Sequence, residues 1–347
     1  MNTLKALGWC DFFENDFSTY KVTGFSTARV INENKERYTI HNGSEELTAE
    51  VSGKLIYTAN TPSDFPKTGD WVVVTEFPDE KKAIIHNVLK RKSIFSRSAP
   101  GNSNQEQIIV ANIDVLFIVQ ALDSNFNINR LQRYLVMVYQ GNIVPFVILN
   151  KSDLVDDESK FISQIKKLSV DLDVLSISAA ENKGIDELIK ILEPEKTYAL
   201  VGSSGVGKST IINKIMGDEI QSVSGIRVKD NRGKHTTTRR ELFITNEGAI
   251  LIDTPGMREF GLLDTSDSIQ EVFSEFEKLS HSCRYSDCTH TVESGCAVLE
   301  AVQKGVVSEG HFNNYLKLLK EQEYFDTKSN KNLMLERKRK ERQLHRL

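Results

Sequence analysis

Hydrophobic and polar positions follow two different rhythms in this chain, and the change falls near residue 108. Between residues 20 and 90, apolar and β-branched positions form short runs bounded by turn-forming residues, a pattern typical of strands. The clearest runs are Val51–Tyr57, Trp71–Thr75 and Ala83–Val88. Several short strands within about 70 residues predict a small all-β barrel. A five-stranded OB-like barrel fits this length, and an SH3-like barrel is the open alternative.

From Ile108 onward, strand patterns alternate with helical ones, which predicts a mostly parallel α/β sheet covered by helices on both faces. The expected strands are Val115–Val119, Pro145–Leu149, Val174–Ile177, Tyr198–Val201, Glu241–Thr245 and Ala249–Ile252. The expected helices are Arg130–Tyr139, Phe161–Leu172, Ile185–Leu192 and Thr210–Met216. Residues 98–107 are polar and turn-rich, and we interpret them as a linker or mobile loop.

These patterns together predict a multidomain protein. We assign residues 1–97 to an N-terminal segment and the barrel, residues 108–267 to the α/β domain, and residues 268–347 to a mostly helical domain with a basic tail. The segment up to Phe17 contains Trp9, Phe12 and Phe13 but no motif that indicates its role.

The charge of the chain is nearly balanced, with a formal net charge of −4, and its basic residues gather locally. One cluster is Lys90–Lys92, and a longer one surrounds Lys338–Lys340 near the C-terminus. Such clusters either neutralise RNA phosphates or form solvated surface, and both interpretations stay open here. No apolar run approaches the ~20 residues of a membrane span, and the N-terminus lacks a signal-peptide pattern, so we expect a cytoplasmic protein.

The sequence after the strand Tyr198–Val201 matches the phosphate-binding pattern G-x-x-x-x-G-K-[ST] and leads into an expected helix. Its glycines let successive backbone N–H groups point at an anion, and the helix N-terminus adds partial positive charge. Lys208 would reach the β- and γ-phosphates, and the Ser209 hydroxyl would bind Mg²⁺. The expected nucleotide-binding residues are Gly202, Ser203, Ser204, Gly205, Val206, Gly207, Lys208, Ser209 and Thr210.

A second motif, with Asn150, Lys151, Ser152 and Asp153, follows the strand Pro145–Leu149 and indicates which base is bound. A carboxylate accepts two hydrogen bonds side by side, and guanine offers two adjacent donors on its Watson–Crick edge. Asp153 therefore selects guanine, whereas an ATP site would leave this carboxylate unexplained. Ser178 and Ala179, at another strand end, suit a backbone N–H directed at guanine O6.

Two further segments predict the elements that sense the γ-phosphate. Asp253 and Gly256 form a D-x-x-G motif at a strand end, where Asp253 would hold Mg²⁺ through water. Thr237, or alternatively Thr236, would bind Mg²⁺ when the γ-phosphate is present. Met257 occupies the place of a water-orienting glutamine, so His235 is a candidate catalytic residue, and a surface histidine is its alternative.

Three of the four cysteines lie close together with one histidine, in the spacing Cys283-x4-Cys288-x-His290-x5-Cys296. Three thiolates and one imidazole complete a tetrahedral zinc site and leave no open position for catalysis, so we expect one structural zinc ion. Reduced, metal-free cysteines are the alternative. The spacing differs from that of DNA-reading fingers, so we expect no DNA partner.

The order of these motifs indicates a circular permutation, because the guanine motif at residues 150–153 precedes the phosphate loop at residues 202–209. A small barrel, a permuted GTPase and a Cys3His module in one chain resemble the bacterial ribosome small-subunit-dependent GTPase A family. The resemblance implies a GTP hydrolase that assists late assembly of the 30S subunit, binds 16S rRNA and is stimulated by the subunit. It also matches His235 and Met257 to the family's histidine and apolar residue at those places.

A nucleotide-gated RNA-binding scaffold with incidental turnover is the alternative to a subunit-stimulated GTPase. A permuted GTPase of the large subunit is less consistent, because it would leave the barrel and the cysteine cluster unexplained. We expect GTP or GDP with magnesium and one zinc as cofactors, and a monomer without membrane contact. Gly256 and Cys283 are close together in the sequence, which further suggests that nucleotide state repositions the zinc module.

Overall fold

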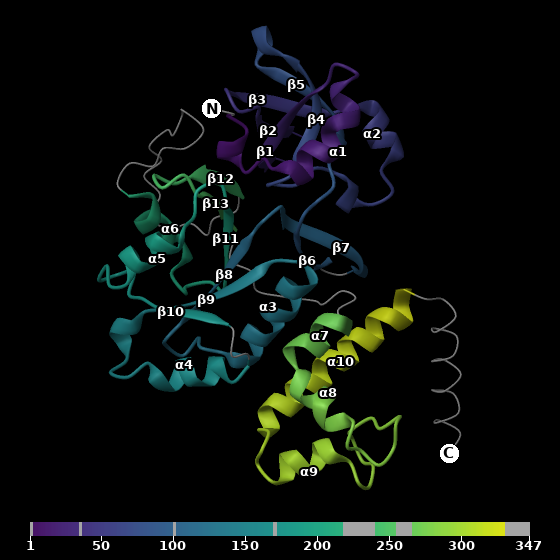
Figure 1. Cartoon of the computed structure of the whole chain (residues 1–347), viewed down its shortest axis with the longest axis vertical. Helices are drawn as coiled ribbons and strands as arrows, with labels where there is room; N and C mark the ends of the chain where they lie inside the picture. Colours follow the sequence, from purple (N-terminus) through teal and green to yellow (C-terminus); the bar gives the residue numbers. More distant parts are fainter. Residues whose placement is uncertain are drawn as a thin grey trace.

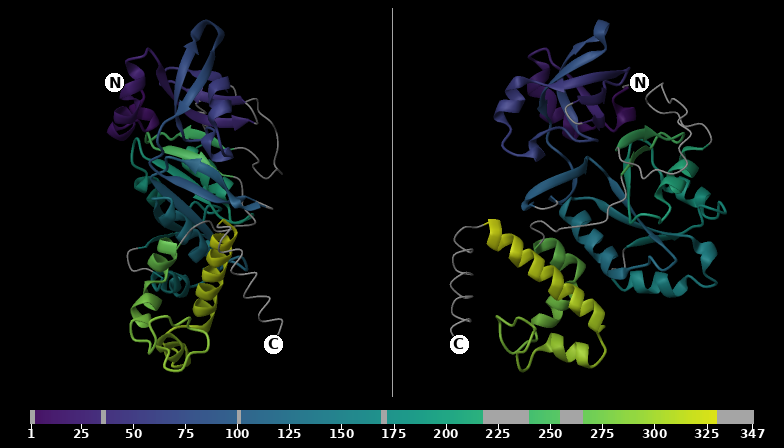
Figure 2. Two further views of the ribbon diagram at one scale, coloured as in Figure 1. Left: turned by 90° about the vertical axis from the view of Figure 1, so that its right-hand side faces the viewer. Right: turned by 180° about the vertical axis from the view of Figure 1, so that it is seen from behind.

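The structure is a computed structural model that describes residues 3–34, 37–99, 102–168, 172–217, 240–254 and 266–329. Its described part has three regions in a row (Figure 1): a barrel, a central sheet with its helices, and a group of C-terminal helices. Two further views show the same succession, with the barrel and the C-terminal helices at opposite ends (Figure 2). Within these residues, no helix is both long enough and apolar enough to cross a membrane.

Five strands form the closed barrel, which confirms the OB-like prediction. They are β1 (Ser26–Asn34), β2 (Arg37–His41), β3 (Glu46–Val51), β4 (Trp71–Phe77) and β5 (Lys82–Val88). The order β1-β2-β3-β5-β4 closes through a β1–β4 pairing, so neither end of this sheet is left as an open edge. The short 3-10 turns η2 (Pro62–Asp64) and η3 (Pro78–Glu80) lie before and after β4.

The strand expected at Val51–Tyr57 is wrong beyond its first residue. The chain instead forms helix α2 (Gly53–Thr58), because Ser52 caps it by accepting a hydrogen bond from the Leu55 N–H at 3.2 Å. Only Leu55 of this helix is buried, while Tyr57 is 91% exposed. The Ser52 cap therefore outweighs the β-sheet preference of the residues in this short run.

The N-terminal segment, whose role the sequence did not reveal, covers the outside of the barrel. It forms η1 (Lys5–Leu7) and α1 (Asp11–Lys21). Trp9, Phe13 and Phe17 are buried there against Trp71 of β4, and the Trp9 and Trp71 ring centroids lie 4.7 Å apart. These aromatic residues form a second apolar cluster on β4, separate from the barrel interior.

The central sheet is mostly parallel and covered on both faces, as the sequence predicts. Its order is β10 (Asp173–Ser176), β9 (Val144–Asn150), β8 (Val115–Ala121), β11 (Thr197–Val201), β13 (Ile250–Asp253) and the antiparallel β12 (Glu241–Ile244). Helices α3 (Ile128–Gln140) and α4 (Ser159–Lys166) cover one face. Helices α5 (Ile185–Ile191) and α6 (Lys208–Met216) cover the other.

The linker expected at residues 98–107 is wrong, because these residues belong to an antiparallel hairpin of β6 (Ile94–Ala99) and β7 (Asn102–Ala111). Polar cross-strand pairs support it. The Ser96 hydroxyl donates to Glu106 at 2.7 Å, and Arg97 Nε donates to the Gln107 side chain at 3.0 Å. The hairpin buries Phe95, Ile108 and Val110 at its base, while its outer part pairs polar side chains across the two strands, so the composition of that part resembles that of a loop.

The C-terminal helices are α7 (Ser266–Val272), α8 (Ser274–Ser280), α9 (Ala297–Gln303) and α10 (Glu309–Ser329). They share one apolar cluster with α3 and the sheet face beneath it. Polar contacts fix α10 on α3: Asn314 donates to the Gln132 side chain at 2.7 Å, and Arg133 forms a two-pronged ion pair with Glu321 at 2.5 and 2.7 Å. These helices thus pack directly on the central region.

A buried arginine of β1 joins the barrel to the central sheet. Arg29 is 1% exposed and donates to the backbone oxygens of Leu7, Gly69 and Asn112 and to the Thr197 hydroxyl. Burial lowers the pKa of Arg29 to about 10, so the guanidinium still carries its charge at neutral pH. Because its acceptors come from four separate segments, this one charge holds them together.

Replacing Arg29 should therefore weaken the whole junction. Arg29→Met leaves its oxygen acceptors buried without their donor, and we expect the free energy of unfolding to fall by about 3 kcal/mol. Urea denaturation measures this loss. The matched control Arg37→Met, at a position whose side chain is 75% exposed, should change stability by less than about 0.5 kcal/mol. Equal effects of the two substitutions would contradict this role.

Candidate nucleotide and metal sites

The expected nucleotide-binding residues gather at one edge of the central sheet. Asn150 ends β9, Asp253 ends β13, Ser178 lies just after β10, and Gly202 follows β11. These four strands are parallel, so their carboxyl ends meet at the same edge, where ligands of open α/β sheets bind. Permutation changes the order of the segments along the chain but not this edge.

The phosphate loop has a backbone that only glycine adopts without strain. Gly202 and Gly207 have φ of +153° and +99°. A Cβ at Gly207 would lie 2.2 Å from Asn150 Nδ2, and one at Gly202 would lie 2.5 Å from the Val119 oxygen. The first turn of α6, with Lys208 and then Ser209 and Thr210, follows directly. This geometry suits an anion held by backbone N–H groups at a helix N-terminus.

Lys208 is folded back into the loop. It is 8% exposed, and its ammonium group donates to the oxygens of Gly202 at 2.8 Å and Ser203 at 3.0 Å. Burial lowers the pKa of Lys208, while the negative charge of Asp253 acts in the opposite direction. The amine and the carboxylate are thus close enough to interact, which is the arrangement expected where a phosphate and Mg²⁺ are bound together.

Asn150 joins three loops of the site through one side chain. It is 3% exposed, its amide nitrogen donates to the Val206 oxygen at 2.8 Å, and its amide oxygen accepts from the Ala179 N–H at 3.0 Å. The guanine motif, the phosphate loop and the Ser178–Ala179 segment are therefore tied to one another. This amide therefore fixes the position of the guanine motif relative to the phosphate loop.

The remaining residues of the guanine motif are oriented by neighbouring side chains. The Ser178 hydroxyl donates to Asp153, and Ser152 is buried in the 3-10 turn η4 (Ser152–Leu154). Lys151 has a left-handed backbone, with φ of +65°, and its ammonium group lies 2.8 Å from Asp123. That hydrogen bond lowers the pKa of Asp123.

Asp123 contacts Lys151 of the guanine motif, and no sequence motif predicts it. Its signal was its place: it comes two residues after β8, at the carboxyl end of a parallel strand. The residues His235, Thr236, Thr237, Gly256 and Met257, in contrast, lie outside the described residues.

The zinc candidates come together as the spacing predicts. The ligand atoms of Cys283, Cys288, His290 and Cys296 all lie within 4.8 Å of one another. A tetrahedral zinc ion would place two sulfurs about 3.8 Å apart and a sulfur and a nitrogen about 3.6 Å apart. The distance between the sulfurs of Cys283 and Cys296 is 3.9 Å, and His290 Nδ1 lies 3.6 and 3.4 Å from those sulfurs. The donor set and its spacing fit zinc.

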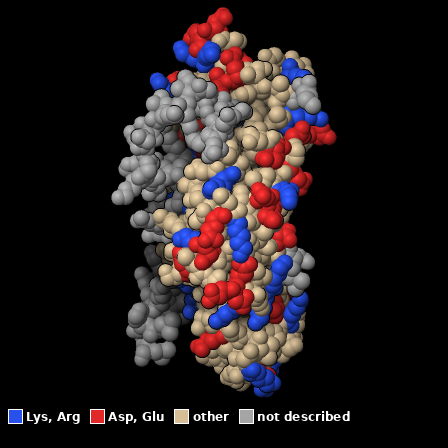
Figure 3. Space-filling view, turned by 90° about the vertical axis from the view of Figure 1, so that its left-hand side faces the viewer, with Lys and Arg blue, Asp and Glu red and all other residues tan. Residues whose placement is uncertain are grey.

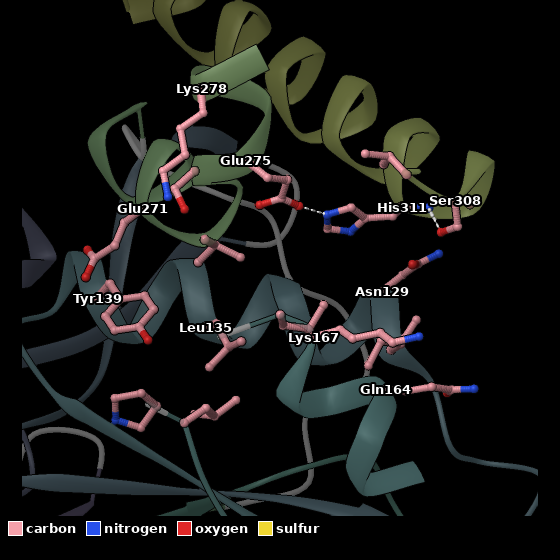
Figure 4. Close-up of a pocket in the computed structure, with 18 of the residues that line it drawn as sticks. Asn129, Leu135, Tyr139, Gln164, Lys167, Glu271, Glu275, Lys278, Ser308 and His311 are labelled. Carbon is pink, nitrogen blue, oxygen red and sulfur yellow. Dashed lines mark hydrogen bonds and ion pairs between the residues drawn. The ribbon is translucent and has the colours of Figure 1, made fainter. Parts of the chain in front are cut away.

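A cleft of about 1700 Å³ is lined by residues of α3, of α4 and its C-terminal end, and of the C-terminal helices (Figure 4). Leu135, Tyr139 and Lys167 line one wall, and Glu275 and His311, joined by a hydrogen bond, line the other. No residue of the nucleotide motifs contributes to it. The size of this cleft therefore does not identify the nucleotide site, which the loop geometry locates at the sheet edge.

Comparison with known proteins identifies the family. Residues 88–263 match the RsgA GTPase family. The chain belongs to this family. It is 38% identical to the small ribosomal subunit biogenesis GTPase RsgA of Methanosarcina acetivorans, over 96% of this chain and 89% of that protein. The protein of the same name from Opitutus terrae is 38% identical over 93% of this chain and 90% of its own length.

Two solved structures share the fold. YjeQ from Thermotoga maritima superposes with a TM-score of 0.60 at 25% identity, covering 86% of this chain and 98% of that one. YloQ, described as a circularly permuted GTPase, gives a TM-score of 0.58 at 20% identity, covering 86% and 95%. The permuted GTPase fold is thus confirmed, and as an RsgA GTPase the chain is a GTP hydrolase.

Changing the base-reading carboxylate should change the preferred base. Asp153→Asn replaces an acceptor by a donor, so GDP affinity should fall at least about tenfold and xanthosine diphosphate, which carries an oxygen in place of the amine, should bind better. Competition against a fluorescent guanine nucleotide measures both. The exposed neighbour Asp157 provides the control Asp157→Asn, which should keep the preference for guanine. An unchanged preference in the Asp153 variant would contradict its role.

Metal analysis tests the zinc site. We expect about one zinc per chain in the purified protein, and Cys283→Ser should lose it and unfold at a temperature several degrees lower, because structural zinc contributes directly to folding. Cys10 is exposed and lies outside the cluster, so Cys10→Ser should keep both the metal and the melting temperature. If wild-type protein melted at the same temperature with and without its metal, a structural zinc site would be ruled out.

Proposed function

We propose that this chain is a GTP hydrolase that acts in the maturation of the small ribosomal subunit, in the cytoplasm and as a monomer. The names of its relatives carry this proposal, because they are called small ribosomal subunit biogenesis GTPases and match almost the whole chain. The assembled nucleotide edge supports it, since all described motif residues converge there.

We assign the roles at this edge as follows. Asp153 reads guanine, Lys208 contacts the β- and γ-phosphates, and Ser209 with Asp253 holds Mg²⁺, which would stabilise charge on the phosphates. Thr237 is the proposed second side-chain ligand of Mg²⁺. His235 is the proposed water-orienting residue, and its alternative as a surface histidine stays open.

Binding of 16S rRNA is part of the proposal, but the cluster at Lys90–Lys92 gives it little support, because only Lys90 has a largely exposed side chain. Arg91 is held internally by Asp70, with nitrogen–oxygen distances of 2.8 and 2.9 Å, and Lys92 lies 2.6 Å from Asp114. The second basic cluster lies outside the described residues. On the face shown in Figure 3, positive and negative side chains are interspersed and form no large patch of one sign.

Helix α2 of the barrel offers a better RNA contact. Tyr57 is 91% exposed, and Lys54, also exposed, lies one helical turn before it. An exposed aromatic ring can stack on an unpaired base while a lysine one turn away neutralises a phosphate. We therefore propose α2 as part of the surface that contacts rRNA.

The experiment for this function is GTP turnover with purified small subunits, large subunits or neither. We expect small subunits alone to raise turnover by about tenfold or more, which corresponds to at least about 1.4 kcal/mol of added transition-state stabilisation. Lys208→Ala should remain inactive in all three conditions. Nucleotide-dependent subunit binding without stimulation would favour the scaffold alternative, and equal stimulation by large subunits would contradict the proposal.

A further inference from the structure

The barrel and the nucleotide site are connected through one row of the sheet. Asn32 of β1 pairs with Glu241 of β12, and Glu241 pairs in turn with Asp253 of β13. Figure 1 shows β12 on the side of the central sheet that faces the barrel. A displacement of β1 across this row would therefore be passed through only one intervening strand to Asp253, whose charge already acts on Lys208.

An ion pair reinforces this row at its barrel end. Glu33 of β1 lies 2.6 Å from the Lys67 ammonium group and 3.7 Å from the guanidinium of Arg240, the residue before β12. The three side chains are only 15–23% exposed. Salt screens a partly buried ion pair less than a surface pair, so the attraction between these charges is stronger at the same distance.

Glu33 supplies the negative charge that compensates for the burial of the Arg240 guanidinium. Burial lowers the pKa of Arg240, the charge of Arg97 acts in the same direction, and Glu33 is the acidic group that opposes both. Arg240 Nε and Glu33 Oε2 are buried and have no hydrogen-bond partner among the described residues. The ion pair between Arg240 Nη1 and Glu33 Oε2, 3.7 Å apart, is thus the interaction that offsets the burial of the Arg240 guanidinium.

We propose that Glu33 is a positioning residue for GTP hydrolysis: it holds Arg240, fixes β12 against the barrel, and thereby sets the place of Asp253 beside Lys208. The barrel would then be a mechanical support of the nucleotide site as well as a binding domain. This inference rests on the proposed role of Asp253 at the magnesium site, and it makes barrel contacts a route by which a bound subunit alters turnover.

The direct test is backbone amide hydrogen exchange of β12 and β13 in nucleotide-free protein. Arg240→Gln breaks this ion pair but leaves the Lys67–Glu33 pair intact, and Glu33→Gln breaks both. Exchange in both strands should become roughly 2- to 30-fold faster in each variant, the range that such coupling residues produce. The Mg²⁺ concentration that half-saturates tight GDP binding should rise by a similar factor.

A double-mutant cycle separates this pair from a general loss of stability. The doubly substituted protein should exchange no faster than Glu33→Gln alone, because the second change removes nothing further. The control Glu50→Gln removes a partner from Arg37 at 3.5 Å elsewhere on the barrel, where both side chains are at least 66% exposed, and should leave both measurements unchanged.

Additive effects in the cycle, or unchanged exchange with unchanged Mg²⁺ dependence in Arg240→Gln, would overturn the proposal. Neither measurement uses ribosomal subunits. A failure of small subunits to stimulate turnover would therefore count against the proposed function alone, and a failure of the exchange experiment against the positioning role alone.

Discussion

The arrangement of the barrel against the central sheet depends on one buried charge. Arg29 has hydrogen bonds to oxygens of Leu7, Gly69, Asn112 and Thr197, which belong to four distant segments of the chain. Burying an ionised group costs much free energy unless its donors are hydrogen-bonded. The folded chain must therefore bring these four oxygens together around the Arg29 guanidinium. The guanidinium therefore specifies one relative position of the barrel, the end of the β6–β7 hairpin and β11. The same strand, β1, pairs with β12 a few residues later, so the barrel meets the nucleotide sheet at two points.

With the sheet fixed, the nucleotide site follows from where parallel strands end. Asn150 binds the backbone at Val206 and Ala179, and these three residues need only be close in space. Their order along the chain has no influence on that contact, because β9, β10 and β11 keep their places in the sheet. A circular permutation moves the termini and leaves the edge chemistry intact, which explains why motifs in reversed order still form a familiar site.

Features set by backbone geometry or by ligand chemistry were predictable from the sequence, whereas features set by tertiary contacts were not. The phosphate loop and the Cys3His spacing specify their own geometry, and the alternation of strands and helices specified the sheet. The helix at α2 was missed because the Ser52 cap outweighed a β-rich composition, and the hairpin at β6–β7 was missed because its outer part pairs polar side chains across the two strands. For Arg91 the sequence left RNA contact and solvated surface as open alternatives, because no sequence pattern reveals that Asp70 lies beside it.

The packing of the C-terminal helices limits how nucleotide state can move the zinc module. Gln132 and Asn314 are 0% and 7% exposed, and they meet at the contact of α3 with α10. Lifting α10 from α3 would break that bond, the two-pronged Arg133–Glu321 pair and a shared apolar cluster. Each buried polar group left without a partner costs about 1–3 kcal/mol, and a ligand shifts an equilibrium only by its difference in affinity for the two states. Moving α8 or α9 would also disturb that cluster and the Glu275–His311 contact. A rearrangement confined to the zinc loop between α8 and α9 leaves the polar contacts of α10 intact, so any repositioning by the nucleotide should occur there while α10 stays on α3.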